Sequence, residues 1–408
     1  MQKNKKKKVS LIYILIGAAI ALGVAGYLVN GGASRLAALS LEIVVNPEIT
    51  VKEQEETPSL IIAGSRDSKL GSFVFTANSQ DQTISKLQLI VPEPGAFSML
   101  DVTIAYTNRN GVVEKKSQPI VVQKRDGYAL FTGLNMFLPK GQARTVDVYV
   151  QSASIAAGAT SGVELSARLD KDLFVANSVD GTQVTEFFGL GDLTLAGQHI
   201  VKSYPEIKGL KKGSDAPSSI TPLFEFTVAA NSAGAVEWKK MTFAIAASGV
   251  NVSNLYLREK GYAAKVNDAP AQINSRGEVE IFAGTATNHV VEQIRAGGSK
   301  TYQLFAESVT GWSSGDSLTA SISKDWQNLS KFTGIELGKI GKFVWSDRST
   351  ARHTINTNDW FVSSLVPHEP LTSGAATYTY SSGSALNTPP QENPRCNSWW
   401  PWSTCAIR

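Results

Sequence analysis

Short segments in which hydrophobic and polar residues alternate recur along most of the chain, and this pattern predicts β-strands. Val102–Tyr106 and Thr145–Val150 show the period of two that places one row of side chains on a core and the other on the surface. Asn110-Gly111 lies between two extended runs, and both residues accept the positive φ angles of a tight hairpin turn. We therefore predict an all-β protein built from β-sandwiches.

One long apolar segment departs from this pattern near the start of the chain. Val9–Val29 contains no charged residue, and the first acidic residue in the chain is Glu42. About 20 apolar residues in an α-helix span the hydrocarbon core of a bilayer. We predict a transmembrane signal-anchor helix over 9–29 with the lipid bilayer as its partner. A cytoplasmic basic segment over 1–8 precedes it and contains Lys3, Lys5, Lys6, Lys7 and Lys8.

These five lysines set the expected membrane orientation, because basic residues beside a transmembrane helix stay on the cytoplasmic side. The chain is then a single-pass protein of the cell membrane, and its C-terminal part is extracellular. Cleavage near Ser34 would instead give a secreted protein, since Gly31 and Ala33 have the small-x-small spacing of a signal-peptidase site. The length of the apolar run favours the uncleaved anchor.

The exported part contains one sequence pattern twice. We predict a linker over 30–47, a first β-sandwich domain over 48–196, and a second over 197–368 with closing strands. Each copy has about 150 residues, more than the ~100 of an immunoglobulin domain, so long loops or additional strands are expected. Four collinear matches support the duplication: Ser72–Thr76 with Leu223–Thr227, Gly127–Gly133 with Gly277–Gly284, Gly141–Ser152 with Gly297–Ser308, and Ser161–Ala167 with Ser314–Ala320.

Two tryptophans stand near the end of the second copy, in Phe343-Val-Trp-Ser-Asp347 and Asn358-Asp-Trp-Phe361. Trp345 and Trp360 have two interpretations, a platform for a ligand or buried strands that close the second sandwich. Large aromatic side chains are more often part of a core, so we favour the closing strands.

The Lys-rich start, the single anchor and the tandem repeats ending in Phe-x-Trp-Ser-Asp together resemble a known class of protein. They are similar to membrane-anchored bacterial surface proteins with tandem immunoglobulin-like β-sandwich domains, in particular uncharacterised ones of the candidate-phyla type. The resemblance implies two tandem immunoglobulin-like sandwiches after one transmembrane helix, and a structural or adhesive role at the surface. It implies no catalytic residues.

The C-terminal region differs in composition from the repeats. Residues 369–395 are rich in Ser, Thr, Gly and Pro and are expected to form a linker, followed by a Trp-rich tail over 396–408. Cys396 and Cys405, the only cysteines, can form a disulfide in an oxidising compartment. The ring would present Trp399, Trp400 and Trp402 for binding, or it would pack back onto a sandwich and cover an apolar patch.

The charge balance and the motifs argue against several classes of function. The net charge of +4 comes from the five N-terminal lysines, because the other 34 basic residues face 35 acidic ones. This balance argues against a nucleic-acid partner. The four histidines lack metal-binding spacing, and Asp170-Lys-Asp172 lacks the further ligands of a calcium loop, so a solvated strand end is favoured there. We expect no catalytic residues, no metal and no cofactor.

The leading prediction is a non-enzymatic, membrane-tethered binding, adhesive or structural module of the bacterial envelope. Its expected partners are cell-wall or surface glycans, another surface protein, or a second copy of the chain. One alternative is a self-assembling subunit of a surface layer or filament, in which strand edges pair between copies. A second alternative is a surface glycan hydrolase, whose paired carboxylates would meet only in the folded chain.

Overall fold

The computed structural model describes residues 47–54, 56–190, 193–210, 221–325, 329–332, 341–363, 365–367 and 376–379. Their strands all belong to one compact unit, Glu48–Arg408. Within the described ranges, no helix is long and apolar enough to cross a membrane. This part of the chain is all-β, with two single-turn 3-10 helices, η1 (Gly95–Phe97) and η2 (Ile155–Ala157). The predicted anchor over 9–29 lies outside the described residues.

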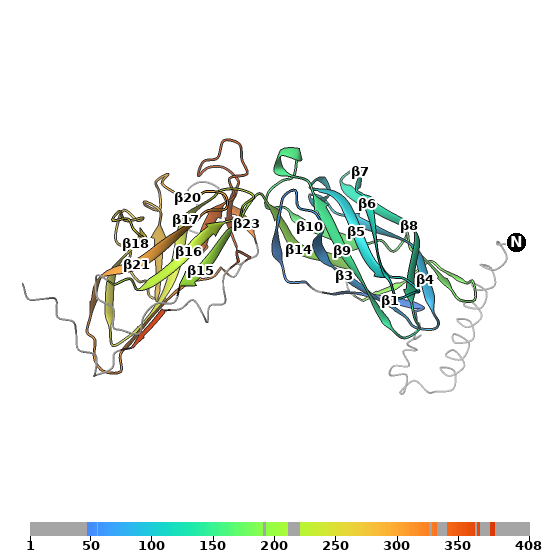
Figure 1. Cartoon of the computed structure of the whole chain (residues 1–408), viewed down its shortest axis with the longest axis horizontal. Coiled ribbons are helices and arrows are strands. Elements are labelled where there is room, and N and C mark those ends of the chain that lie inside the picture. Colours follow the sequence, from blue (N-terminus) through green and yellow to red (C-terminus); the bar gives the residue numbers. More distant parts are fainter. Residues whose placement is uncertain are drawn as a thin grey trace, which may run out of the picture. The chain divides into compact units, whose positions relative to one another are not determined.

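The first fourteen strands form two sheets around one hydrophobic core (Figure 1). They are β1 (Ile49–Gln54), β2 (Ser59–Ile62), β3 (Ser68–Ala77), β4 (Gln82–Val91), β5 (Met99–Thr107), β6 (Val113–Pro119), β7 (Val121–Gln123), β8 (Asp126–Leu138), β9 (Ala143–Ser152), β10 (Glu164–Leu169), β11 (Val175–Ser178), β12 (Gln183–Val184), β13 (Phe188–Leu190) and β14 (Thr194–Val201). One sheet has the order β13-β1-β3-β9-β5-β6; the other has β12-β11-β4-β10-β14-β2, with β8 also paired to β4 and β7 to β8. We call this the first sandwich.

The remaining strands form a second pair of sheets with a core of its own. They are β15 (Pro205–Leu210), β16 (Phe224–Ala230), β17 (Val236–Ser248), β18 (Asn251–Glu259), β19 (Glu278–Phe282), β20 (Glu292–Ile294), β21 (Ser299–Thr310), β22 (Ser317–Ile322), β23 (Ser330–Phe332), β24 (Phe343–Ser346), β25 (Trp360–Val362) and β26 (Ala376–Thr379). One sheet has the order β15-β16-β21-β18; the other has β23-β25-β24-β17-β22-β26, with β19 and β20 also paired to β17. We call this the second sandwich.

The two sandwiches share their central strand order. The run β1-β3-β9-β5 corresponds to β15-β16-β21-β18. In the other sheet of the first sandwich, β4 pairs with β8 and β10, and β10 pairs with β14. In the second sandwich, β17 correspondingly pairs with β19 and β22, and β22 pairs with β26. Each of the four sequence matches falls on a corresponding pair of strands: β3 with β16, β8 with β19, β9 with β21, and β10 with β22. The duplicated sequence pattern thus encodes the same connectivity twice.

Alternation along the strands explains which side chains reach the cores. Val102 and Ile104 on β5 are fully buried, and Val148 on β9 is equally buried against them in the first core. The predicted hairpin between β5 and β6 is present: Gly111 has a φ of 77°, and the Asn108 side chain accepts hydrogen bonds from the turn's amides. The period of two therefore places strand residues correctly on core or surface.

Two expected boundaries differ from the observed strands. The expected division between residues 196 and 197 falls inside β14, which pairs with β10 and β2 of the first sandwich. The linker expected over 369–395 contains β26, which pairs with β22. Alternating Thr and Tyr residues favour a strand there. The Tyr378 ring is 1% exposed in the second core, and its hydroxyl donates to the Pro222 carbonyl at 2.9 Å.

Candidate functional site

The binding and pairing residues predicted from the sequence lie outside the described residues. Trp399, Trp400 and Trp402, the cysteines Cys396 and Cys405, and the five N-terminal lysines therefore remain predictions. The described part of the chain offers a different polar site, at the end of β24, where the Phe-x-Trp-Ser-Asp segment leaves the second sandwich.

The two tryptophans beside this site are core residues. Trp345 and Trp360 have no exposed surface, and the Trp345 ring packs against Phe361 with a centroid distance of 4.9 Å. β24 pairs with β25, and the Trp360 indole donates to the Thr354 carbonyl at 2.9 Å. The closing-strand interpretation is confirmed, and an exposed ligand platform at these residues is excluded.

Asp347 follows β24 directly and connects the two sandwiches. Its side chain is fully buried and accepts hydrogen bonds from the Ser161 hydroxyl of the first sandwich and from the Lys202 amide at 2.8 Å. The Ser349 amide donates to its other oxygen at 3.0 Å. Burial raises the pKa of Asp347 above its usual value, against the hydrogen bonds, which lower it. Because a buried carboxylate without partners is costly, these three donors are needed to hold it there.

A glycine of the first sandwich allows this close approach. Gly162 has a φ of 76°, and a Cβ there would lie 2.6 Å from the Phe361 ring and 2.2 Å from the Lys331 side chain. Leu60 and Ile62 of β2 also pack against the second core, which includes Val201. Polar and apolar contacts therefore join the two sandwiches. We call the contacts made by Ser161, Gly162, Lys202 and Asp347 the joint.

Beside the joint, a histidine bridges two carboxylates. His353 Nε2 lies 2.7 Å from Glu237 Oε2, and its Nδ1 lies 2.9 Å from Asp359 Oδ2. The three side chains are at most 8% exposed. Arg348 Nε is 3.2 Å from the other oxygen of Glu237, an ion pair without hydrogen-bond geometry. The four groups thus form a compensated ionic cluster at the base of the loop 347–359.

The protonation states follow from this arrangement. Burial alone would lower the pKa of His353, but hydrogen bonds and charges of Asp359 and Glu237 outweigh it and raise the pKa to about 9. Burial would raise the pKa of Asp359, yet hydrogen bonds from His353, Thr357 and the Thr350 amide lower it to about 2. At neutral pH the histidine is a cation between two anions, so it acts as a fixed structural charge.

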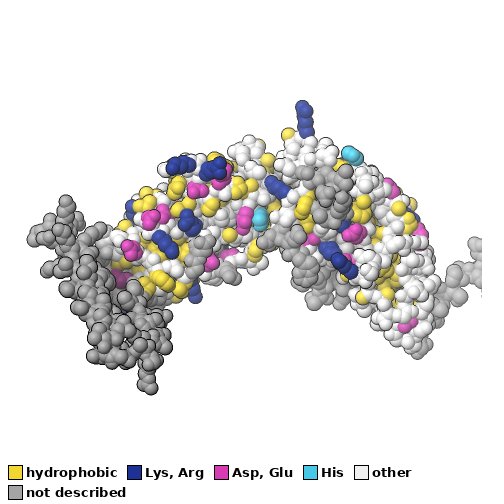
Figure 2. All heavy atoms as spheres, turned by 180° about the vertical axis from the view of Figure 1, so that it is seen from behind, with side chains coloured by type: hydrophobic (Ala, Val, Ile, Leu, Met, Phe, Trp, Pro, Cys, Tyr) yellow, Lys and Arg dark blue, Asp and Glu magenta, His cyan; other side chains and the backbone are white. Residues whose placement is uncertain are grey.

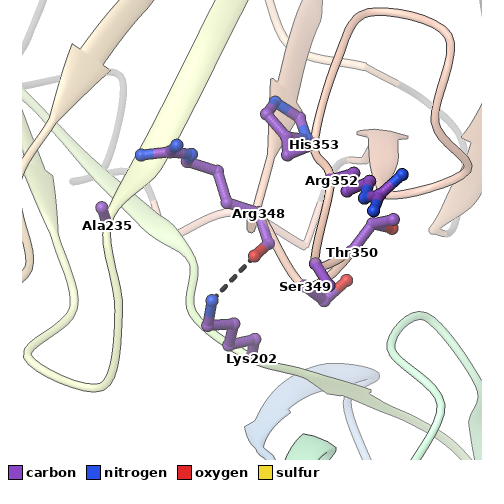
Figure 3. Close-up of a pocket in the computed structure, with 8 residues that line it drawn as sticks. Lys202, Ala235, Arg348, Ser349, Thr350, Arg352 and His353 are labelled. Carbon is purple, nitrogen blue, oxygen red and sulfur yellow. Dashed lines mark hydrogen bonds between the residues drawn. The ribbon is translucent and has the colours of Figure 1, made fainter.

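The first part of this loop, from Arg348 to His353, lines a pocket of about 480 Å³ (Figure 3). Lys202 Nζ donates to the Arg348 carbonyl at 2.7 Å, and the Arg348 side chain runs towards Ala235 while Arg352 points the other way. Cationic side chains with the hydroxyls of Ser349 and Thr350 suit an anionic group. One of these cations, Arg348, already pairs with Glu237.

Other sequence interpretations have clear outcomes. Asp170-Lys-Asp172 follows the end of β10, as the strand-end interpretation predicts. Asp170 is half-buried there and accepts hydrogen bonds from the Gln88 side chain at 2.8 Å and from the Asp172 amide at 3.0 Å, so it stabilises the turn. His353 was not predicted as part of a site, because Glu237 lies 116 residues away in sequence and only the fold brings them together. No local signal in the sequence indicates that pair.

Comparisons with known proteins assign this chain to no family. Neither a protein-family model nor a curated protein matches it. Weak likenesses exist to solved structures: a "Biofilm associated protein - B domain" (TM-score 0.18, 8% identity, 80% of this chain and 88% of that one) and a "Putative membrane anchored protein from Corynebacterium diphtheriae" (0.15, 8%, 82% and 92%). A "tetra-tandem repeat in extending region of large adhesion protein" follows (0.11, 10%, 82% and 66%). Likenesses at these TM-scores carry no argument about the present chain.

Proposed function

We propose that this chain is a non-enzymatic module of a bacterial surface, in which two immunoglobulin-like sandwiches form a spacer with a fixed joint. The spacer would stand between the membrane anchor predicted over 9–29 and the Trp-rich tail predicted over 396–408. The joint carries this proposal, because Asp347 is held at once by a residue of the first sandwich and by the backbone that leads into the second.

A flexible linker between domains would leave the spacing variable, whereas buried hydrogen bonds and glycine packing favour one arrangement. Only residues 202–204 connect β14 and β15, and the Lys202 amide in this connection donates to Asp347. The face in Figure 2 shows Lys and Arg side chains interspersed with acidic and hydrophobic ones. A mixed surface of this kind suits a soluble spacer.

Single-molecule FRET on the full chain in nanodiscs tests the fixed spacing. Val179 and Tyr262, 67% and 65% exposed, are replaced by cysteine for the dyes, and Cys396 and Cys405 by serine. One narrow distance distribution is expected, which Asp347→Ala broadens and the exposed control Asp172→Ala leaves unchanged. A broad distribution for the parent chain, or no effect of Asp347→Ala, would contradict the proposal.

A further inference from the structure

The second sandwich contains a buried lysine, Lys239, that takes no part in the joint. Lys239 lies at a β-bulge in β17, where the register with β24 shifts between Trp238 and Lys240. Bulges re-aim side chains. β19 and β20 pair with β17 on either side of this position, so residues 283–291 leave the sheet at Lys239. The lysine is 1% exposed and extends beneath that loop.

Three oxygens of the loop surround the amine. Lys239 Nζ lies 2.7 Å from the carbonyls of Ala283 and Val290 and 3.0 Å from Oδ1 of the Asn288 side chain. The same carboxamide is held from its other end, because Asn288 Nδ2 donates to Asp268 Oδ2 at 3.1 Å. An amine, a carboxamide and a carboxylate are therefore in consecutive contact.

Gly284 fixes the position of the carboxamide. It has a φ of 69°, and a Cβ there would lie 2.4 Å from Asn288 Nδ2 and 2.5 Å from Oδ1. The Asn288 side chain consequently packs directly on the glycine backbone, next to Nζ. No other residue type at position 284 would leave room for this contact.

The environment also favours the reactive form of the amine. Burial lowers the pKa of Lys239 to about 8, and the charge of Asp268 raises it by less. The three oxygens hold the protonated amine, and the neutral form is a minor fraction at pH 7 that grows as the pH rises through 8. A desolvated neutral amine is a competent nucleophile. Holding it against an electrophilic carbon removes most of the entropic barrier to attack.

We propose that Lys239 and Asn288 form an intramolecular isopeptide bond. The Nζ lone pair attacks Asn288 Cγ, the Nζ–Cγ bond forms, the Cγ–Nδ2 bond breaks, and ammonia leaves. One proton passes from Nζ to Nδ2 as the adduct collapses, and Asp268, hydrogen-bonded to Nδ2 at 3.1 Å, holds that nitrogen in place as the leaving group. The product amide ties the loop 283–291 to β17 without metal, cofactor or oxidant.

Mass spectrometry of the full-length protein tests this bond. The intact denatured chain is expected to be lighter than its sequence by one ammonia. Trypsin does not cut at an acylated lysine, so digestion should give one branched product of residues 213–240 and 277–295. A succinimide at Asn288 would have the same mass loss but would leave these two peptides separate, and that result would overturn the proposal.

Variants separate the chemistry from folding. Asn288→Ala should have the full sequence mass and no branched peptide, while Lys265→Arg, an exposed control, should behave as the parent chain. Asn288→Asp keeps the shape of the side chain and should form the bond with loss of water. Asp268→Asn should slow bond formation at least tenfold after refolding. A parent chain that keeps its full mass after prolonged incubation at pH 8–9 would show that Lys239 only holds the loop by hydrogen bonds.

Discussion

The His353 cluster predicts a specific dependence of stability on pH. His353 has a pKa of about 9 in the folded chain and about 6.5 when unfolded. Between pH 6.5 and 9 the folded state therefore binds more protons than the unfolded state. A raised histidine pKa stabilises the fold fully below pH 6.5. This contribution is lost progressively as the pH rises from 6.5 through 9.

The magnitude follows from the same two values. Each pKa unit corresponds to about 1.4 kcal/mol, so protonation of His353 contributes up to about 3 kcal/mol to the free energy of unfolding at pH 6. Little discount for solvent is needed, because the imidazole and Glu237 are each 8% exposed and Asp359 is 2% exposed. His353→Gln removes the titrating group and keeps a polar side chain of similar length.

Urea unfolding at several pH values between 6 and 9.5 provides the assay. The parent chain should lose stability relative to His353→Gln by about 3 kcal/mol across this range. Lys239, with a folded pKa of about 8, opposes this trend above pH 8 if its amine is free, but it contributes equally to both chains and cancels in their difference. Parallel curves for the two chains would refute the assigned ionic cluster.

Three further experiments test the joint and β26. In a double-mutant cycle, Asp347→Ala and Ser161→Ala should show a coupling of about 1–3 kcal/mol in urea unfolding, and a coupling near zero would contradict their hydrogen bond. Gly162→Ala should destabilise by at least ~1 kcal/mol more than Gly158→Ala, which also has positive φ but open space around it. Tyr378→Ala should cost about 3–5 kcal/mol, and unchanged stability would mean that β26 adds nothing to the core.

The sequence pattern was sufficient for the features that depend on local periodicity. Strands such as Val102–Tyr106, the Asn110-Gly111 hairpin and the burial of Trp345 follow from alternation, turn chemistry and hydrophobicity. The repeated strand order could be anticipated because matching segments keep their order along the chain. β26 was missed because four residues in a polar, Ser- and Thr-rich stretch give a weak signal, although Tyr378 alternates with Thr there.

The polar sites could not be predicted in the same way, since they depend on residues far apart in sequence. Ser161 and Asp347 are 186 positions apart, and Lys239 and Asn288 are 49 apart. Sequence alone also treats a lysine in a strand as a surface residue, whereas Lys239, at the bulge in β17, is 1% exposed and contacts Ala283 and Val290. Only tertiary packing determines these pairs.

The proposed surface function is tested most directly by binding of the full-length protein, in nanodiscs, to isolated bacterial cell walls, to a glycan panel and to itself. The same chain lacking residues 394–408 is the matched variant. We expect that one of these surfaces is bound, that the truncation abolishes binding, and that the temperature of unfolding of the two chains is the same. Unchanged binding with a lower unfolding temperature after truncation would contradict it, as would release of sugar fragments from the glycans.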